Sequence, residues 1–274
     1  MSAARPFLKW AGGKTKLVSA IATTVPVTAR RLVEPFVGSG AVALNLSLPE
    51  NLLADTNADL VAAYTRLRDA PEEFIAECAG LFTPEANSPA VYYQRREEFN
   101  ALADPARRAA LFIYLNRHGY NGLCRYNARG GFNVPFGRYR APYFPRDEMR
   151  AFHSLLRRST LVHADFRDVL AQAGPGDFVY CDPPYVPASP TANFTAYARS
   201  AFGPAEQEAL AACCAAARQR GAVVALSNHD TPQTRALYAA DDECHELLVR
   251  RQISCQGANR TKARELLVVY RPAA

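Results

Sequence analysis

Short apolar runs alternate along this chain with segments of helical periodicity. Because parallel strands need a helical crossover to return to the same edge of a sheet, this alternation predicts an α/β fold. Seven of the runs have the length and β-rich composition of strands, and together they predict a single sheet. They cover residues 31–36, 51–55, 159–164, 177–181, 222–227, 244–250 and 265–270.

One helix is well delimited between the fourth and fifth predicted strands. Pro204 favours its start and Gly221 its end, because proline suits the first helical turn and glycine the residue after the last. Leu210, Cys214 and Ala217 recur at helical spacing and mark one apolar face. The segment is therefore predicted to be a crossover helix that packs on the sheet.

The succession of strands is interrupted between about residues 57 and 144. Helical patterns occupy 88–102 and 104–117, and a loop region rich in glycine, asparagine and arginine follows, HGYNGLCRYNARGGFNVPFGRY. We therefore predict a sheet domain formed by residues 1–56 and 145–274, interrupted by a helical insert over 57–144.

Positive charge is concentrated in two stretches. The net charge is +6, and residues 105–146 contain eight arginines and no acid, so the rest of the chain sums to 6 − 8 = −2. A second acid-free stretch, 247–264, holds Arg250, Arg251, Arg260, Lys262 and Arg264. Localised basic segments on a nearly neutral body are typical of a surface that binds a polyanion such as DNA, although a solvated basic surface would look similar.

Composition narrows the class of protein further. The chain is 49% hydrophobic, which is enough for a core, and no apolar run is long enough to span a membrane or form a secretory signal, so we expect a soluble intracellular protein. Its seven cysteines are odd in number and lack a CxxC pair, and Cys213 with Cys214 fits helix packing. Neither structural disulfides nor a zinc site is expected.

A Gly-x-Gly turn follows the first predicted strand in EPFVGSGAV, residues 34–42. Such strand-to-helix turns let a ligand approach the backbone, and an acid after the next strand can hold ribose hydroxyls. Asp55 lies 17 residues after Gly38, close to that spacing. The third glycine of a pyrophosphate-binding turn is missing, which favours an adenosine ligand without a diphosphate. An ordinary strand-to-helix turn is the alternative.

The stretch WAGGKTK near the N-terminus resembles the end of a phosphate-binding loop at Gly13, Lys14 and Thr15. The NTPase interpretation fails, because the glycine required five residues before Gly13 is Leu8. Lysine occurs only four times among 32 basic residues, and three of the four lie in this stretch or directly before it, at Lys9, Lys14 and Lys16. This concentration favours a compact charge for a carboxylate over ordinary surface lysines.

The stretch FVYCDPPYVP ends an apolar strand in one acid, two prolines and a tyrosine. Asp182 stands at the carboxyl end of the predicted strand, where open α/β sheets bind ligands. Because Pro183 and Pro184 have fixed φ angles and no N–H, the carbonyls of Asp182 and Pro183 are held as acceptors beside Tyr185. Two fixed acceptors suit an aromatic amine, whose nitrogen lone pair can then be turned toward an electrophile. No strong general base is needed if the nitrogen attacks before it loses its proton.

These stretches resemble the Dam-type DNA adenine methyltransferases. FLKWAGGK, EPFVGSG, LADTN, YLNRHGYNGLCRYN, FNVPFGRY, ADF, DPPY, TANFTAY, SNHDT and ELLVVY occur in the family's order along nearly the whole chain. The resemblance implies the methyltransferase version of a doubly wound, mostly parallel, Rossmann-like sheet with a helical target-recognition insert. It also implies metal-independent methyl transfer from S-adenosylmethionine to the N6 amino nitrogen of adenine in duplex 5′-GATC-3′.

The resemblance further implies a set of cofactor-binding residues. The methionine end would be held by Trp10, Ala11, Gly12 and Lys14. The bed of the cofactor would be lined by Phe36, Gly38 and Gly40. The ribose and the adenine ring would be held by Asp55, Asp165 and Phe166. The carboxylate of Asp182 would lie at both the cofactor and the target base.

Contacts with DNA are implied in the same way. The target adenine would be flipped out of the duplex and held by Asp182, Pro183, Pro184 and Tyr185. An aromatic wedge would fill the vacated stack at Tyr120, next to Asn121. For sequence reading, guanine edges or the backbone would accept from Lys9 and Arg125, and thymine methyls would contact Leu123 and Pro135. Bases or phosphates would face Arg138. Phosphates would be held by Arg96, Arg117, Asn127 and Asn133.

Two other functions stay open at this point. The cytosine amino group offers the same two hydrogens to Asp182 and Pro183, although family members that act on cytosine usually carry serine in place of Asp182. A non-catalytic DNA-binding or cofactor-sensing protein is disfavoured by the intact Asp182 and the intact turn at Gly38.

The expected setting of the protein is a monomer in the cytoplasm, either bacterial and associated with the nucleoid or encoded by a phage, with duplex DNA and no membrane as partner. A solitary role and a role beside a restriction nuclease fit the sequence equally. His229 could line the base pocket or cap a loop, and residues 186–197 could form a mobile lid.

Overall fold

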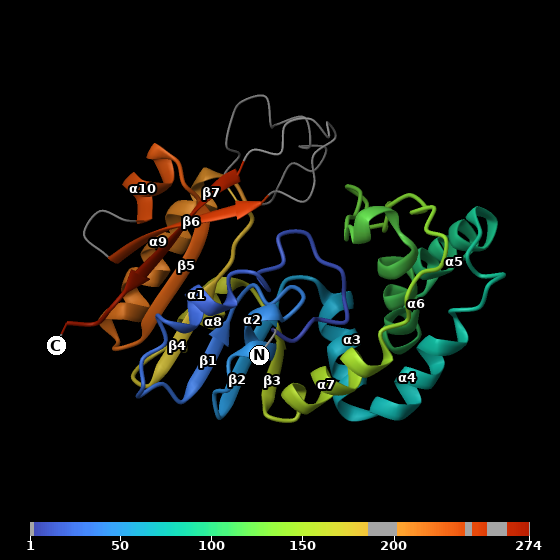
Figure 1. Ribbon diagram of the computed structural model, residues 1–274, viewed down its shortest axis with the longest axis horizontal. Coiled ribbons are helices and arrows are strands. Elements are labelled where there is room, and N and C mark those ends of the chain that lie inside the picture. The colour runs from blue at the N-terminus through green and yellow to red at the C-terminus, as the bar shows by residue number, and fades with distance from the viewer. Residues whose placement is uncertain (1–2, 186–201, 239–242, 251–261, 274) are drawn as a thin grey trace. The chain divides into compact units, whose positions relative to one another are not determined.

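The computed structural model describes residues 3–185, 202–238, 243–250 and 262–273 of the chain. Seven strands are ordered β3-β2-β1-β4-β5-β7-β6 (Figure 1). Their bounds are β1 Arg31–Glu34, β2 Glu50–Asp55, β3 Ser159–His163, β4 Asp177–Cys181, β5 Val223–His229, β6 Glu243–Arg250 and β7 Lys262–Tyr270. The seven strands predicted from the apolar runs are therefore confirmed, with their ends shifted by a few residues.

The pairing of the strands confirms the doubly wound, mostly parallel class. Strand β2 pairs with β3, β1 with β4 and β4 with β5, all in parallel. Strand β7 runs antiparallel to both β5 and β6. The order of the strands reverses between β1 and β4, and open α/β sheets bind their ligands at the carboxyl ends of the strands at such a point.

The helices fall mostly between the strands and in the predicted insert. Their bounds are α1 Val18–Ala22, α2 Ala41–Asn45, α3 Ala58–Asp69, α4 Pro71–Gly80, α5 Pro89–Ala101, α6 Pro105–His118, α7 Arg146–Leu156, α8 Phe166–Leu170, α9 Pro204–Gln219 and α10 Pro232–Tyr238, with a 3₁₀ turn η1 at Tyr120–Gly122. The two helices predicted over 88–102 and 104–117 are α5 and α6.

The chain divides into two compact units. Unit 1 comprises residues 1–19 and 37–164, and unit 2 comprises residues 20–36 and 165–274. The helices of the predicted insert lie in unit 1 together with β2 and β3. The boundaries 57 and 144 of a separate recognition domain stay a prediction.

Side-chain caps begin the long helices of unit 1. Asn57 starts α3, Ser88 starts α5 and Asp104 starts α6, and each accepts a hydrogen bond from a backbone N–H of the first turn. Helix α6 is buried on nearly all sides and packs against α3, α4 and α5. A scaffold of this kind can hold the polar loop that follows α6 in place.

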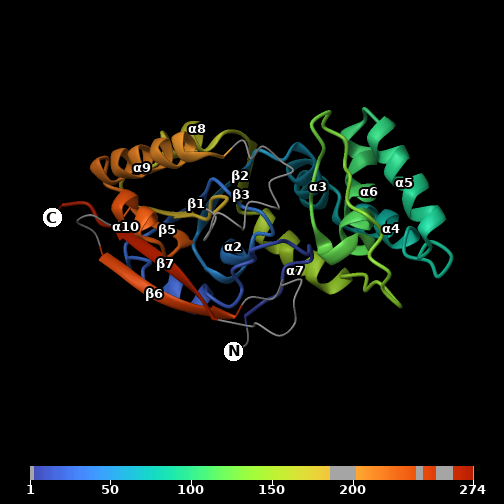
Figure 2. The ribbon, with the colours of Figure 1, turned by 90° about the horizontal axis from the view of Figure 1, so that it is seen from above.

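Unit 2 consists of the other five strands and the helices that cover them. Helix α9 packs against α8, β5 and β7, and Figure 2 shows α8 and α9 along one face of these strands. Leu210, Cys214 and Ala217 are buried as predicted, and α9 is the crossover helix between β4 and β5. The start of β1 is joined to β4 by a two-point ion pair between Arg31 and Asp177, with N to O distances of 2.9 and 2.7 Å.

Candidate active site

The Gly-x-Gly turn lies against the ring of Trp10 in unit 1. Gly38 and Gly40 have φ angles of +47° and +67°, a left-handed region that suits glycine. A Cβ added at Gly38 would lie 2.7 Å from Nε1 of Trp10, and one at Gly40 would lie 2.5 Å from Cζ of Phe152. Both positions therefore require glycine, and the first keeps the indole ring close to the backbone of the turn.

Asp55 is joined to the same turn. Its carboxylate accepts hydrogen bonds from the backbone N–H of Gly38 at 3.1 Å and from that of Asn57 at 2.9 Å. Burial raises the pKa of Asp55, and these two backbone donors partly oppose the shift. The acid and the turn, which the sequence made candidates for one adenosine site, are therefore in direct contact, in a geometry that suits the hydroxyls of a ribose.

The WAGGKTK segment forms a compact turn beside this acid and glycine pair. Gly13 N–H donates to the carbonyl of Trp10 at 3.3 Å, and the ammonium of Lys14 donates to the carbonyl of Gly12 at 2.9 Å. Lys14 is only 6% exposed, whereas Ala11 and Gly12 are exposed. A buried ammonium behind an accessible backbone suits an amino acid carboxylate.

Unit 2 presents an aromatic cluster after β1. The rings of Phe36 and Phe166 stack with centroids 5.6 Å apart, and Phe202 contacts both at 5.6 Å. Asp165 caps α8 and binds Arg167, whose guanidinium lies 4.4 Å from the centre of the Phe166 ring. The sequence predicted Phe36, Asp165 and Phe166, but neither Arg167 nor Phe202. A cluster of aromatic rings beside a carboxylate is suited to hold an adenine ring.

Asp182 directly follows β4, so the acid lies at the carboxyl end of a central strand, as predicted. The carbonyl of Pro184 accepts a hydrogen bond from Nε2 of Gln207 at 2.8 Å. The hydroxyl of Tyr185 donates to Oε2 of Glu265 at 3.0 Å. The ring of His229 meets that of Tyr185 edge-on at 4.9 Å, so His229 lies beside the Asp-Pro-Pro-Tyr turn.

Gln207 is the buried polar residue behind this turn, and the sequence did not predict it. It is 3% exposed, and its amide oxygen accepts hydrogen bonds from Asn228 at 3.2 Å and from the hydroxyl of Tyr238. Because two donors occupy the oxygen, the amide NH₂ must face the carbonyl of Pro184. The orientation of the amide is thus determined by its neighbours.

The loop after α6 carries most of the predicted DNA contacts. Single antiparallel bridges join Gly119 to Phe136 and Tyr126 to Phe132, so the loop folds back on itself. Tyr120 is 49% exposed at its start, and its N–H donates to the carbonyl of Pro135 at 2.8 Å. An exposed aromatic ring on a fixed backbone is the geometry that an intercalating wedge requires.

Lys9 contacts this loop from the N-terminal segment. Its backbone exchanges two hydrogen bonds with the amide of Asn116, at 2.9 and 2.7 Å. Its ammonium donates to the carbonyl of Arg117 at 3.3 Å and lies 3.8 Å from the centre of the Tyr139 ring. Burial and the nearby Arg117 lower the pKa of Lys9 to about 8. Lys9, the predicted base reader, is therefore held against the loop, and its surroundings partly destabilise the charged form of its side chain.

The remaining predicted DNA residues fall into two groups. Arg125 and Arg138 are exposed, and Leu123 and Pro135 lie on the same loop, partly or fully exposed. The side chains of the others hold the loop or its neighbours: Asn133 accepts a hydrogen bond from Arg125, Arg96 donates to the carbonyl of Val134, Arg117 donates to that of Tyr143, and Asn127 accepts from the N–H of Arg129 and Gly131. These structural contacts were not predicted from the sequence.

Comparison with known proteins decides the family. The signature described as D12 class N6 adenine-specific DNA methyltransferase matches residues 10–253. The chain belongs to this family. It is 48% identical over 268 residues to the DNA adenine methylase of Escherichia coli K12, covering 98% of this chain and 96% of the relative. The DNA adenine methylase of Vibrio cholerae O395 is 46% identical over 273 residues, which cover 99% of this chain and 98% of the relative.

The family resemblance expected from the motifs is thereby confirmed, and the protein is an N6 adenine-specific DNA methyltransferase with DNA as its substrate. Among solved structures, the rRNA methyltransferase AviRa of Streptomyces viridochromogenes is 18% identical with a TM-score of 0.38, covering 98% of this chain and 91% of that one. At that level the likeness carries no conclusion about this methyltransferase.

Two predictions fall on residues outside the described ranges. They are the lid over 186–197 and the contribution of Arg251 and Arg260 to the second basic stretch. Within the described ranges, no helix is long and apolar enough to cross a membrane, and no three His, Cys, Asp or Glu side chains are grouped as metal ligands.

Replacing Gln207 by Glu is expected to lower the turnover of this methyltransferase. The change keeps the oxygen that accepts from Asn228 and Tyr238 but turns the donor toward Pro184 into a second acceptor. We expect kcat to fall about tenfold with little change in KM for the cofactor, because a carbonyl left without its donor loosens the turn by about 1–3 kcal/mol. Steady-state kinetics measures both. Gln172→Glu, an exposed site whose amide donates to the carbonyl of Asp168, is the matched control, and an equal loss there would contradict the prediction.

DNA binding is expected to weaken as the pH rises through about 8, because the pKa of Lys9 is lowered to about 8 in the free protein. Above that pH the neutral amine of Lys9 must take up a proton before it can bind DNA as an ammonium, so the affinity falls by at most about tenfold per pH unit. Lys9→Arg keeps its charge and should flatten the profile. Fluorescence anisotropy with a labelled duplex at constant salt measures this, and identical profiles for the two proteins would refute it.

Proposed function

We propose that this methyltransferase transfers the methyl group of S-adenosylmethionine to N6 of adenine in duplex 5′-GATC-3′, after flipping that adenine out of the duplex. The observation that carries the proposal is the Asp-Pro-Pro-Tyr turn after β4, held by Gln207 from α9 and by Glu265 from β7. Near-half identity to proteins named DNA adenine methylase supports the substrate. The sequence GATC comes from the resemblance to the Dam-type family of the loop after α6, residues 119–145, which we call the reading loop.

The residues present fit the cofactor. A buried carboxylate held by backbone donors, two glycines without room for a Cβ and a buried ammonium lie together in unit 1, at Asp55, Gly38, Gly40 and Lys14. We assign the methionine end to the segment from Trp10 to Lys14 and the ribose to Asp55. In unit 2, Phe36, Asp165 and Phe166 would hold the adenine ring. When bound, S-adenosylmethionine supplies an electrophilic methyl carbon on a sulfonium.

Asp182 and Pro183 would orient the target. The carboxylate of Asp182 and the carbonyl of Pro183 accept the two hydrogens of the amine, which turns the nitrogen lone pair out of the ring plane. Tyr185 would stack on the base, and its hydroxyl bond to Glu265 keeps the ring from rotating away. Positioning of this kind lowers a barrier by up to about 7–11 kcal/mol in favourable systems. The nitrogen would gain the methyl carbon as the carbon–sulfur bond breaks, which would leave S-adenosylhomocysteine. The cationic nitrogen would then lose its proton to water, so no strong base is required.

Residues 57–144 would form the target-recognition part, which acts with the rest of the chain as a monomer in the cytoplasm. Tyr120 would enter the vacated stack, and Lys9, Leu123, Arg125 and Pro135 would read base edges. Arg125 is exposed and held by Asn133 through Nε at 2.8 Å, so one edge of its guanidinium is oriented before DNA binds. A bidentate contact with guanine needs such an orientation.

Plasmid digestion tests the proposal. A plasmid treated with the protein and S-adenosylmethionine should become resistant to a nuclease blocked by methylated GATC and sensitive to one that depends on it. Methylation should be the same when a metal chelator is present during the transfer step. The chelator is removed before digestion. Methylation at other sequences would contradict the proposed recognition of GATC. Methylated cytosine, detected by mass spectrometry of the digested nucleosides, would contradict adenine as the target base.

A further inference from the structure

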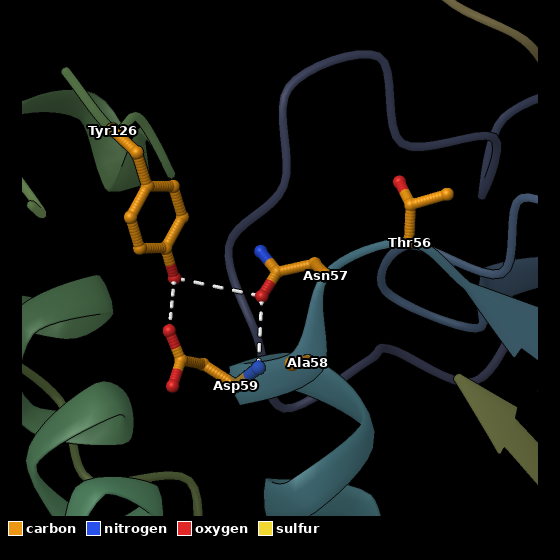
Figure 3. A pocket seen from close by; sticks show the side chains of 5 residues that line it. All are labelled: Thr56, Asn57, Ala58, Asp59 and Tyr126. Carbon is orange, nitrogen blue, oxygen red and sulfur yellow. Dashed lines mark hydrogen bonds between the residues drawn. The ribbon is translucent and has the colours of Figure 1, made fainter. Parts of the chain in front are cut away.

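A polar cluster joins the reading loop to the start of α3, all within unit 1. Thr56, Asn57, Ala58, Asp59 and Tyr126 line a cavity of about 390 Å³ (Figure 3). Tyr126 comes from the loop after α6, whereas the other four come from the turn that follows β2 and from the first residues of α3. The cluster therefore connects segments that are far apart in the chain.

Asn57 makes four different contacts in this cluster, one of them between its amide oxygen and the hydroxyl of Tyr126 at 3.5 Å. Its backbone N–H donates to Asp55 at 2.9 Å, so it touches the acid of the proposed ribose site. Its amide oxygen caps α3 by accepting from the N–H of Asp59 at 3.1 Å and of Leu60 at 3.2 Å. Its amide NH₂ donates to Sγ of Cys124 in the reading loop at 3.3 Å. One residue thus lies between the proposed cofactor site and the loop.

Tyr126 makes the stronger connection. Its hydroxyl donates to Oδ2 of Asp59 at 2.7 Å, and Figure 3 shows the ring pointing from the loop toward the start of α3. Asp59 is also paired with Arg108 of α6 at 2.8 Å, and its side chain is only 13% exposed. A hydroxyl that donates to a charged, mostly buried carboxylate forms one of the stronger hydrogen bonds in proteins.

Tyr126 lies next to the residues that are proposed to read bases. Arg125 immediately precedes it, and Leu123 lies three residues before it. On its other side Tyr126 forms a bridge with Phe132 and packs against its ring at 5.6 Å, close to Asn133, which binds Arg125. A shift of the Tyr126 ring would therefore displace the neighbouring backbone of Leu123 and Arg125, and also Asn133, which holds the side chain of Arg125.

We infer that Tyr126 is a positioning residue for sequence reading, which holds the loop on the start of α3 through Asp59, with Asn57 as a second attachment. The inference rests on the proposed recognition of GATC, because Leu123 and Arg125 read bases only in that function. It assigns to the cluster a role in discriminating between base pairs, separate from the binding of phosphates.

The decisive measurement is the ratio of kcat/KM for a GATC duplex to that for a duplex with one changed base pair that keeps the target adenine. Tyr126→Phe retains the ring and removes the hydroxyl, while Asp59 keeps its bond from Arg108 at 2.9 Å. We expect the ratio to fall about tenfold, since a displaced base reader loses part of its discrimination. Because both rates come from one preparation, the fraction of folded enzyme cancels.

Asn57→Ser provides a second variant. Serine caps helices about as well as asparagine, so α3 should remain intact while the bond to Cys124 is lost. The ratio should fall in the same direction by a smaller factor. This variant carries the test if Tyr126→Phe does not fold, as judged from its thermal transition.

Tyr114→Phe is the matched control. Its hydroxyl donates to the carbonyl of Ala86 in the same unit, so the change also removes one buried hydrogen bond, but away from the reading loop. The ratio should be unchanged. A wild-type ratio retained in both Tyr126→Phe and Asn57→Ser, or an equal fall in the control, would overturn the inference. A wild-type enzyme without preference for GATC would instead overturn the proposed sequence, and the inference with it.

Discussion

Asp182→Ala is expected to reduce methyl transfer by about 1000-fold or more, because it removes the charged acceptor that orients the target amine. The carbonyl of Pro183 cannot replace it, since in the proposed mechanism this carbonyl already accepts the other hydrogen of the amine. Tritium transfer from labelled S-adenosylmethionine to a GATC duplex under single-turnover conditions measures the chemical step. Full activity in the variant would end the proposed mechanism.

The variant should remain folded, because Asp182 follows the end of β4 and is not part of its ladder. Its thermal transition therefore serves as the control. Asp182→Asn keeps one oxygen but can present an NH₂ group to the amine, so we expect it to lose nearly as much activity. Activity near wild type in Asp182→Asn would show that an uncharged acceptor is sufficient.

Gly38→Ala is expected to weaken S-adenosylmethionine binding by about 100-fold. The φ angle of Gly38 is +47°, which costs a residue with a side chain about 1 kcal/mol. The added Cβ would also lie 2.7 Å from Nε1 of Trp10, so the indole ring has to leave the turn. Calorimetric titration with S-adenosylmethionine measures the affinity, and Trp10, as the single tryptophan, reports its own displacement by fluorescence.

Gly176→Ala separates strain from the clash. Gly176 has a φ angle of +83° and no atom within 4 Å of an added Cβ, so it shares the backbone cost without displacing any neighbour. It should lower the melting temperature without changing cofactor affinity. If both variants bind S-adenosylmethionine equally well, the proposed site at Trp10 and Gly38 is wrong.

Local patterns were sufficient to predict the strands and the crossover helix α9, and to select Gly38 and Asp55 as candidates for one ligand site. Each depends on residues close in sequence: apolar runs form strands, proline and glycine delimit a helix, and an acid after one strand meets the turn that follows its neighbour. The same holds for the Asp-Pro-Pro-Tyr turn, whose backbone is restricted by its own prolines.

Residues that hold the site in place were missed for the opposite reason. Gln207 lies 23 residues from Pro184, Glu265 lies 80 from Tyr185, and Asp59 lies 67 from Tyr126. In the sequence each resembles an ordinary polar position on a helix or strand. A polar side chain makes a structural contact only when folding buries it against a partner. The residues next to it in the sequence do not show which residue that partner is.

The amino-acid sequence by itself determined the class of sheet, the acid and prolines that would hold an amine and the basic loop, because these depend on residue chemistry and short-range geometry. Only the tertiary structure decided which polar groups support them: Gln207 behind Pro184, Glu265 on Tyr185 and Asp59 on Tyr126. Those contacts require distant segments to be packed to within hydrogen-bond distance. Burial makes each of these hydrogen bonds important for stability, because a polar group removed from water must find its partner within the protein.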